Sequence, residues 1–199
     1  SFDALVFRSP WDYPDRVSEF NQWLETTSRL TRLLNPPQLI RWNFDKRYLL
    51  ELEALGVRCT PTTFCSQIDQ CLDAAKAVLA DGKNCIIKPN ISASSRKTGL
   101  FGETDDGLKN LCQSILDDHK LVMVQPALAS VQNGKEKNML FFNGAFSHAV
   151  HKGIILAPDG KYLEGAISSH SGMAGRPTQP CRSTPELISP QMNTINQYW

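Results

Sequence analysis

Lys88 lies where a lysine could bind phosphate. It ends an apolar run and leads directly into Pro-Asn-Ile-Ser-Ala-Ser-Ser-Arg-Lys-Thr-Gly. A loop of small and hydroxylated residues lets backbone N–H groups approach phosphate oxygens, and the lysine adds a positive charge. This pattern favours a loop that folds over a nucleotide tail, whereas a solvated turn beside a surface lysine is the alternative. The chain has no G-x-x-x-x-G-K-S/T sequence, so the loop is not a Walker A motif.

Lys46 is a second candidate for phosphate binding. It follows Arg-Trp-Asn-Phe-Asp, and we expect it in the first turn of a helix. The helix dipole disfavours a cation at that end, and a bound anion would offset the penalty. The alternative is a surface lysine paired with Asp45 or Glu51.

Hydrophobic periodicity predicts the elements that must position these lysines, and they alternate between strands and helices in an α+β chain. Asn43 is expected to cap the second helix, and Gly56 to end it. Asn143-Gly144 and Pro158-Asp159-Gly160 predict tight turns between strands. The expected helices are residues 15–30, 43–56, 66–82 and 104–118. The expected strands are 4–8, 84–88 and 121–124, which would be buried, and a short one at 38–42.

Composition excludes several classes of protein. The 199 residues carry 21 basic and 20 acidic side chains, a net charge of +1, so a nucleic-acid surface is not expected. No apolar run reaches the roughly 18 residues of a membrane span, and no secretory leader is evident, so we expect a cytoplasmic protein. The six cysteines form no C-x-x-C pair, and Cys71, Cys85 and Cys112 are expected in the core.

The order of the motifs resembles the ATP-grasp superfamily, and within it the glutathione-synthetase-like and cycloserine-synthetase-like carboxylate–amine ligases. The resemblance covers about residues 2–155 and is carried by RSPWDY, LLNPPQLIRWNFDKRYLLELEALGV, PTTF, IIKPNISASSRKTGLF, VMVQPAL and EKNMLFFNGAFSHAVHK. It implies the ATP-grasp fold, two α+β lobes that enclose a nucleotide cleft, incomplete at both ends. Residues 1–35 would end a preceding substrate domain and linker helix, 36–164 would form the nucleotide-binding lobes, and 165–199 would be irregular.

The resemblance also implies a set of site residues. Lys46 and Lys88 would be catalytic and would touch the ATP phosphates, and Glu136 would bind the ribose hydroxyls. The small-residue lid would correspond to Ser92, Ala93, Ser94 and Ser95, and the adenine-binding segment to Val124, Gln125, Pro126, Ala127 and Leu128. Relatives carry glycines in the lid, but this chain has none before Gly99. The residues facing the acceptor substrate would be Arg8, Asp12, His148 and Lys152.

The implied reaction joins a small-molecule carboxylate to an amine through an acylphosphate, with ATP and Mg²⁺. We find no ligands for the magnesium ion, because Glu164 and Glu186 are the only acids after Asp159 and neither stands in a Glu-x-Asn or Glu-x-Glu sequence. We therefore expect a partial chain, a natural short form or an enzyme whose acids come from a partner. A non-catalytic nucleotide-binding or interaction module is the alternative function. No nucleic-acid or membrane partner is expected, and a homo-oligomer is left open.

Overall fold

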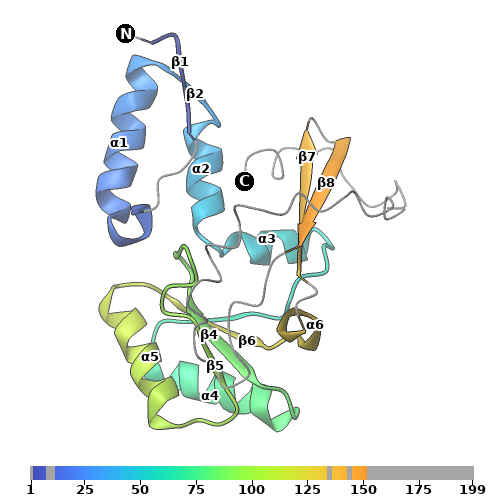
Figure 1. The fold of residues 1–199 in the computed structure, drawn as a ribbon. Helices are drawn as coiled ribbons and strands as arrows, with labels where there is room; N and C mark the ends of the chain where they lie inside the picture. The colour runs from blue at the N-terminus through green and yellow to red at the C-terminus, as the bar shows by residue number, and fades with distance from the viewer. Residues whose placement is uncertain (1, 8–11, 134–135, 143–144, 152–199) are drawn as a thin grey trace. The chain divides into compact units, whose positions relative to one another are not determined.

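The structure is a computed structural model that describes residues 2–7, 12–133, 136–142 and 145–151 (Figure 1). The chain divides into two compact units, residues 1–126 and residues 127–199, and each is described by itself.

The first unit begins with two short parallel strands and a long helix. Strand β1 (Ala4–Val6) pairs with β2 (Arg32–Leu34), and the connection between them contains the 3-10 helix η1 (Tyr13–Asp15) and helix α1 (Val17–Leu30). Their hydrophobic cluster consists of Tyr13, Leu24, Leu33, Ile40 and Phe44. The helix expected over 15–30 is therefore confirmed. The strand expected at 4–8 is present as β1, but the prediction that it is buried is wrong, because Val6 is 62% exposed.

Helix α2 (Pro37–Phe44) replaces the strand expected at residues 38–42, so that prediction is wrong. Pro37 occupies the start of the helix, where a missing N–H costs nothing. Ile40 and Phe44 are one helical turn apart, and both are buried in the cluster around Tyr13. The apolar residues thus follow a helical period, which a five-residue window does not distinguish from a strand.

Helix α3 (Tyr48–Ala54) begins later than expected, so Asn43 is inside α2 rather than at a cap. Lys46 consequently lies in the turn between the two helices and not in a first helical turn. The end of α3 is as predicted: Gly56 has φ +82°. The Gly56 N–H donates to the Glu53 carbonyl and the Val57 N–H to the Leu52 carbonyl, which is the Schellman pattern.

A four-stranded antiparallel sheet forms the rest of the first unit. It contains β3 (Thr63–Cys65), β4 (Cys85–Pro89), β5 (Gly99–Phe101) and β6 (Val122–Pro126) in the order β3-β6-β4-β5. Helices α4 (Ile68–Ala80) and α5 (Asp106–Asp117) pack against it. The strands and helices expected here are confirmed, with ends shifted by one or two residues.

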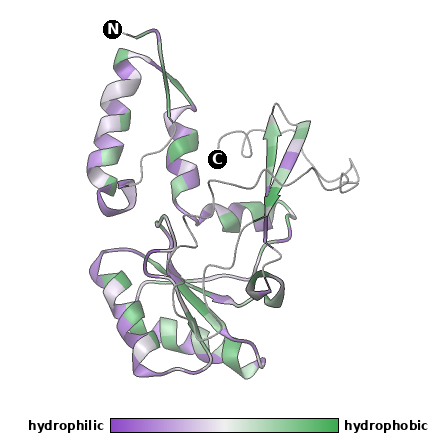
Figure 2. Ribbon diagram, in the orientation of Figure 1, coloured by the Kyte–Doolittle hydropathy of each residue, from purple (hydrophilic) through white to green (hydrophobic). Residues whose placement is uncertain are grey.

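The helices and the sheet share one apolar core. Strands β4 and β6 are hydrophobic along most of their length, whereas the helices alternate between apolar and polar residues (Figure 2). Fully buried side chains of Cys71, Cys85 and Cys112 lie in this core, as the sequence predicted. The other buried members are Cys65, Ala75, Ile87, Leu108, Ile115, Val122 and Val124.

The described part of the second unit is a helix and a hairpin. Helix α6 (Ala129–Gln132) precedes β7 (Lys137–Phe142), which pairs antiparallel with β8 (Ala145–His151). The pairing confirms the predicted hairpin, and a register shift occurs at Leu140 and Phe141. The turn residues Asn143 and Gly144, the turn at 158–160 and the segment 165–199 lie outside the described residues. Among the helices described, none has the length and apolar character needed to cross a membrane.

Candidate functional site

Lys46 points its amino group at backbone oxygens of the segment that follows β4. Its Nζ donates to the Asn90 carbonyl at 3.3 Å, to the Ser92 carbonyl at 3.2 Å and to Ser92 Oγ at 3.1 Å. The two acids considered as partners are bonded elsewhere: Asp45 to Arg47 and Asn90, and Glu51 to the indole N–H of Trp42. Lys46 is therefore held by neutral oxygens, which an anionic ligand could replace.

The surroundings of Lys46 disfavour its positive charge. Burial, followed by the positive charges of Lys88 and Lys120, lowers the pKa of Lys46 to about 8, against the opposing effect of the Asp45 carboxylate. A cluster of like charges that depresses a lysine pKa is a common environment for anion binding, because a bound anion relieves the repulsion. The structure thus brings Lys46 and Lys88 within electrostatic reach of one another.

Lys88 lies on the face of the sheet opposite to the helical core. Along β4, Cys85, Ile87 and Pro89 are buried, whereas Ile86 and Lys88 between them are half-buried. This alternation follows from the two-residue period of a strand. Lys88 pairs with Met123 of β6, and Ile86 pairs with Gln125, so these four side chains belong to one face. Met123 and Gln125 are buried, at 0% and 6% exposure, so this second face of the sheet is also largely covered. A lysine there, beside an apolar neighbour and an amide, could bind the phosphate of a nucleotide whose base lies further along the strand.

Asn90 connects the end of β4 to the turn that carries Lys46. Its side chain is 4% exposed, its Nδ2 donates to Asp45 Oδ1 at 3.0 Å, and its Oδ1 accepts from the Leu121 N–H at 3.0 Å. Asp45 in turn binds the backbone N–H and the guanidinium of Arg47. Burial opposes ionisation of Asp45, but the hydrogen bonds from Arg47 and Asn90 outweigh it and lower the pKa of this carboxyl.

The small-residue loop adopts the backbone geometry that glycine prefers although it contains none. Ser94, Ser95 and Lys97 have φ values of 53°, 54° and 51°. L-residues in this region carry strain of about 1 kcal/mol each. Two serines and a lysine therefore occupy left-handed positions in and beside this loop without the glycines that relatives carry in the lid.

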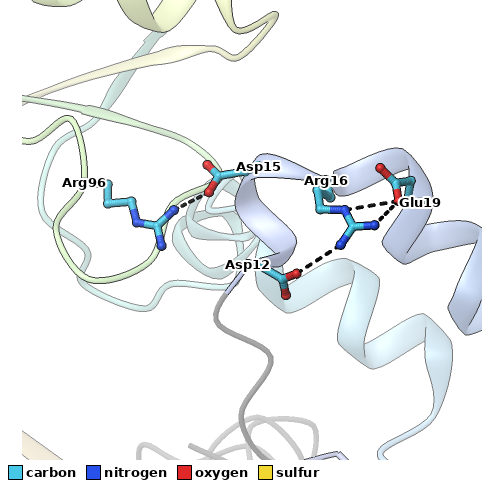
Figure 3. A network of polar contacts seen from close by, with 5 residues as sticks. All are labelled: Asp12, Asp15, Arg16, Glu19 and Arg96. Atoms are coloured by element: carbon cyan, nitrogen blue, oxygen red, sulfur yellow. Dashed lines mark hydrogen bonds and ion pairs between the residues drawn. The ribbon is translucent and has the colours of Figure 1, made fainter.

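Two ion pairs anchor this loop at its far end. Arg96 pairs with Asp15 of η1, next to the pairs that Arg16 forms with Asp12 and Glu19 (Figure 3). The adjacent Lys97 donates to Asp118 Oδ2 at 2.7 Å and to the Ser114 carbonyl at 2.7 Å. Because these pairs are exposed, each contributes little stability, but together they define where the loop lies in the first unit.

The predicted adenine-binding segment begins on strand β6. The Val124 side chain is part of the buried core, Gln125 donates through Nε2 to Thr62 Oγ1 at 2.6 Å, and Pro126 ends the strand. The remaining residues of that segment, Ala127 and Leu128, begin the second unit.

Of the other predicted site residues, Asp12 belongs to the first unit, and Glu136 and His148 belong to the second. Glu136 is half-buried just before β7, and His148 is exposed on β8 with its Nδ1 2.9 Å from Ser147 Oγ. Asp12 is exposed and forms an ion pair with Arg16 at 3.4 Å. Arg8 and Lys152 lie outside the described residues.

A groove of about 680 Å³ is lined in part by Asn90. Its lining includes Asp45, Arg47, Asn90 and Lys120, but neither Lys46 nor Lys88. This groove therefore does not mark the position of the two candidate phosphate-binding lysines, although it shares Asp45 and Asn90 with the contacts around Lys46.

Sequence reasoning missed Asn90 and Lys120. Asn90 could have been found, because it directly follows Lys88-Pro89 and a carboxamide in an apolar-to-loop transition often bonds to backbone groups. Lys120 follows the end of α5 and gives no sequence signal of its own, since its role depends on where that helix ends in space.

Histidine, cysteine and acidic side chains of the described residues are the groups that could ligate a metal ion. No group of three or more His, Cys, Asp or Glu side chains within them is placed to hold an ion. The magnesium ligands that the resemblance implies are therefore not identified within the described part of the chain.

Comparison with known proteins defines the class. The crystal structure of D-cycloserine synthetase DcsG matches with a TM-score of 0.75 and 34% identity, over 81% of this chain and 56% of the other. D-alanyl-alanine synthetase A from Vibrio cholerae O1 biovar eltor matches with a TM-score of 0.56 and 17% identity, over 98% and 56% of the two chains. A RimK domain ATP-grasp protein from Sphaerobacter thermophilus matches with a TM-score of 0.55 and 14% identity, over 76% and 55%. The last two establish the fold alone, and with the first they show that the chain belongs to the ATP-grasp superfamily.

Within that superfamily the chain is similar to the cycloserine-synthetase-like proteins. It is 36% identical over 164 residues to the cycloserine biosynthesis protein DcsG of Streptomyces lavendulae, covering 80% of this chain. The family model for the N-terminal domain of D-cycloserine synthetase DcsG matches residues 1–35. The chain spans about half the length of these relatives, 54% of the Streptomyces protein.

Proposed function

We propose that this chain is the ATP-binding part of an ATP-grasp ligase that joins a carboxylate to an amine. The observation that carries the proposal is the pair Lys46 and Lys88, whose mutual repulsion helps to hold the pKa of Lys46 near 8. Two positive charges that repel each other are stabilised by a ligand with several negative charges, such as a triphosphate.

Each lysine has a distinct part in this proposal. The amino group of Lys46 exchanges its contacts with the Asn90 and Ser92 oxygens for phosphate oxygens. Lys88 neutralises charge from the sheet face, and the hydroxyls of Ser92, Ser94 and Ser95 complete the phosphate contacts. Such positioned charges offset the negative charge that develops on a phosphoryl group as it is transferred.

We further propose that the nucleotide-binding lobes comprise residues 36–164. Gln125 and the segment through Leu128 would receive the adenine, Glu136 the ribose hydroxyls, and Arg8, Asp12, His148 and Lys152 the acceptor substrate. These assignments rest on the family pattern and on the position of Gln125 along the strand pair that carries Lys88.

The chemistry needs no covalent bond to the protein. A carboxylate oxygen attacks the γ-phosphorus and ADP leaves; the amine nitrogen then attacks the acylphosphate carbon, phosphate leaves and the nitrogen loses a proton. Magnesium, which the family uses, would add charge neutralisation. Exclusion of water by the loop after Lys88 would protect the acylphosphate from hydrolysis.

The relatives suggest which substrates to examine first. They are named for cycloserine and for D-alanyl-alanine, so we propose that the carboxylate and the amine are amino-acid derivatives, with D-amino acids among them.

The test is release of ADP from ATP and magnesium in the presence of pairs of amino acids, with mass spectrometry of the products. A productive pair gives stoichiometric ADP and amide, and Lys88→Ala lowers the rate at least about tenfold through loss of a charged contact. Lys76→Ala is the matched control, because Lys76 is exposed on α4 and bonded only to Asp73 among the interactions described. Tight ATP binding without any product across the panel would favour the non-catalytic nucleotide-binding module instead.

A further inference from the structure

We propose that Asn90 is a positioning residue that sets where the amino group of Lys46 stands relative to the end of β4. Only the identity of the ligand that Lys46 meets rests on the proposed function.

All the polar groups of Asn90 are used. Its backbone N–H donates to the Leu121 carbonyl at 3.0 Å, and its carbonyl accepts from the Lys46 N–H at 3.0 Å and from Lys46 Nζ at 3.3 Å. Its side-chain Oδ1 accepts from the Leu121 N–H and its Nδ2 donates to Asp45 Oδ1, both at 3.0 Å. One buried residue thus ties the start of β6, the end of β4 and the Lys46 turn together.

The contact with Asp45 fixes the turn on both sides of Lys46. The Asp45 carboxylate accepts from the Arg47 N–H at 3.0 Å, from Arg47 Nε at 2.8 Å and from its Nη2 at 2.6 Å. Asn90 reaches the same carboxylate from the sheet. These hydrogen bonds hold the residues on both sides of Lys46. The backbone of the turn is therefore fixed at Lys46, and its side chain starts from a fixed point.

A carboxamide is the side chain that these neighbours require. Leu121 offers a donor and Asp45 offers an acceptor, and an amide can satisfy both at once. A serine hydroxyl is shorter and can keep one of the two contacts, and alanine keeps neither. Since the position is 4% exposed, a lost contact leaves a buried polar group without water to replace it.

The position that results keeps the Lys46 amino group among Lys88, Lys120 and the Ser92 oxygens. Release of the turn would let the long side chain move toward water and away from the two other lysines. Its pKa would then rise toward the ordinary value of 10.5, because burial and the neighbouring charges that lower it would weaken. A role confined to stabilising the fold would not move this value while the chain remains folded.

The experiment compares full-length wild type with Asn90→Ser and Asn90→Ala, a neutral series that removes one contact and then both. Asn35→Gly is the matched control: Asn35 is another buried asparagine, it has φ 85°, and its Oδ1 lacks a partner among the described residues. Two quantities are measured for each variant: the affinity for ATP by calorimetry, and the pKa of Lys46 by NMR after ¹³C-methylation, with the resonance assigned from Lys46→Arg.

We expect ATP affinity to fall at least about tenfold in Asn90→Ala and less in Asn90→Ser, since hydrogen bonds to charged groups contribute about that much. The pKa of Lys46 rises in the same order, and Asn35→Gly changes neither quantity. If Asn90→Ala does not fold, Asn90→Ser carries the test. An unchanged Lys46 pKa in folded variants overturns the positioning role. Absence of ATP binding by the wild type contradicts the proposed function instead, and the Lys46 pKa series still decides the role of Asn90.

Discussion

The environment of Lys46 lowers the pKa of its amino group, so this lysine loses its positive charge at a lower pH than an exposed lysine does. Its amino group rests on two carbonyls and a hydroxyl, while its nearest formal charges include Lys88 and Lys120. Neutral oxygens compensate an ammonium only in part, so the site gains more from an anion than an exposed lysine would. This residue therefore gives the candidate site its preference for negative charge.

Proton uptake on ATP binding follows from this environment. With a pKa of about 8, Lys46 is partly neutral at mildly alkaline pH, and bound phosphate raises its pKa by favouring the charged form. ATP binding should therefore take up protons near pH 8, and the affinity should fall as the pH rises through that value. Calorimetry in buffers of different ionisation enthalpy measures the uptake.

The control for this prediction is Lys46→Met, which keeps most of the length of the side chain and removes its charge. In that variant the proton uptake near pH 8 should disappear. A wild-type binding enthalpy that does not depend on the buffer at this pH would show that Lys46 does not titrate with the ligand.

The sequence singled out Lys46 and Lys88 as candidate residues, but it did not indicate the contacts of Asn90 that position Lys46. Both were found because a basic residue at the end of an apolar run or near a helix start is unusual in sequence. The Asn90 bridge depends on Asp45 and Leu121, which are 45 and 31 residues away in the chain. Contacts of that separation exist only once the sheet and the turn are packed, so no local pattern indicates them.

At the scale of the elements, three helices are followed by a residue with a left-handed backbone conformation, and only two of these residues are glycine. Helices α3 and α4 end at Gly56 and Gly82, with φ +82° and +70°, whereas α5 ends at His119 with φ +57°. The His119 N–H donates to the Leu116 carbonyl and the Lys120 N–H to the Ile115 carbonyl, the same Schellman pattern that follows α3. Histidine therefore occupies a position that favours glycine.

His119→Gly should stabilise the protein by about 1 kcal/mol, because the side chain is exposed and glycine removes the steric cost of a left-handed backbone. Urea unfolding followed by circular dichroism measures the change. Gly56→Ala is the converse variant and should destabilise by a similar amount. A lower stability for His119→Gly would contradict this prediction. It would mean that the imidazole contributes more free energy of folding through its contacts than glycine gains by relieving the backbone strain.

Element prediction succeeded where the apolar period was long and failed where it was short. Helices α1, α4 and α5 each contain more than eleven residues, and their buried stripes identified them. Residues 38–42 contain too few positions to separate the two periods, and Pro37 starts helix α2 one residue before the strand that was expected there. Because the start of the helix was misplaced in this way, Lys46 was predicted in a first helical turn, whereas it lies in the turn between α2 and α3.

For the whole molecule, fold class was predictable because the order of elements is a global property. The alternation of strands and helices, with the motifs around Lys46 and Lys88, pointed to the ATP-grasp superfamily, and the comparisons confirm it. The domain limits, the magnesium ligands and the acceptor residues depend on parts of the chain that no local pattern defines, and they stay predictions.

The central claim is that Lys46 and Lys88 bind one polyphosphate, and titration of the chain with ATP in a calorimeter tests it most directly. The variants are Lys46→Met, Lys88→Met and their combination, with Lys76→Met as the matched control for loss of a lysine charge. Each site variant should lose about 10- to 100-fold in affinity and the double variant more than either, whereas the control should bind like the wild type. Equal affinity in the wild type and both single variants would contradict the claim.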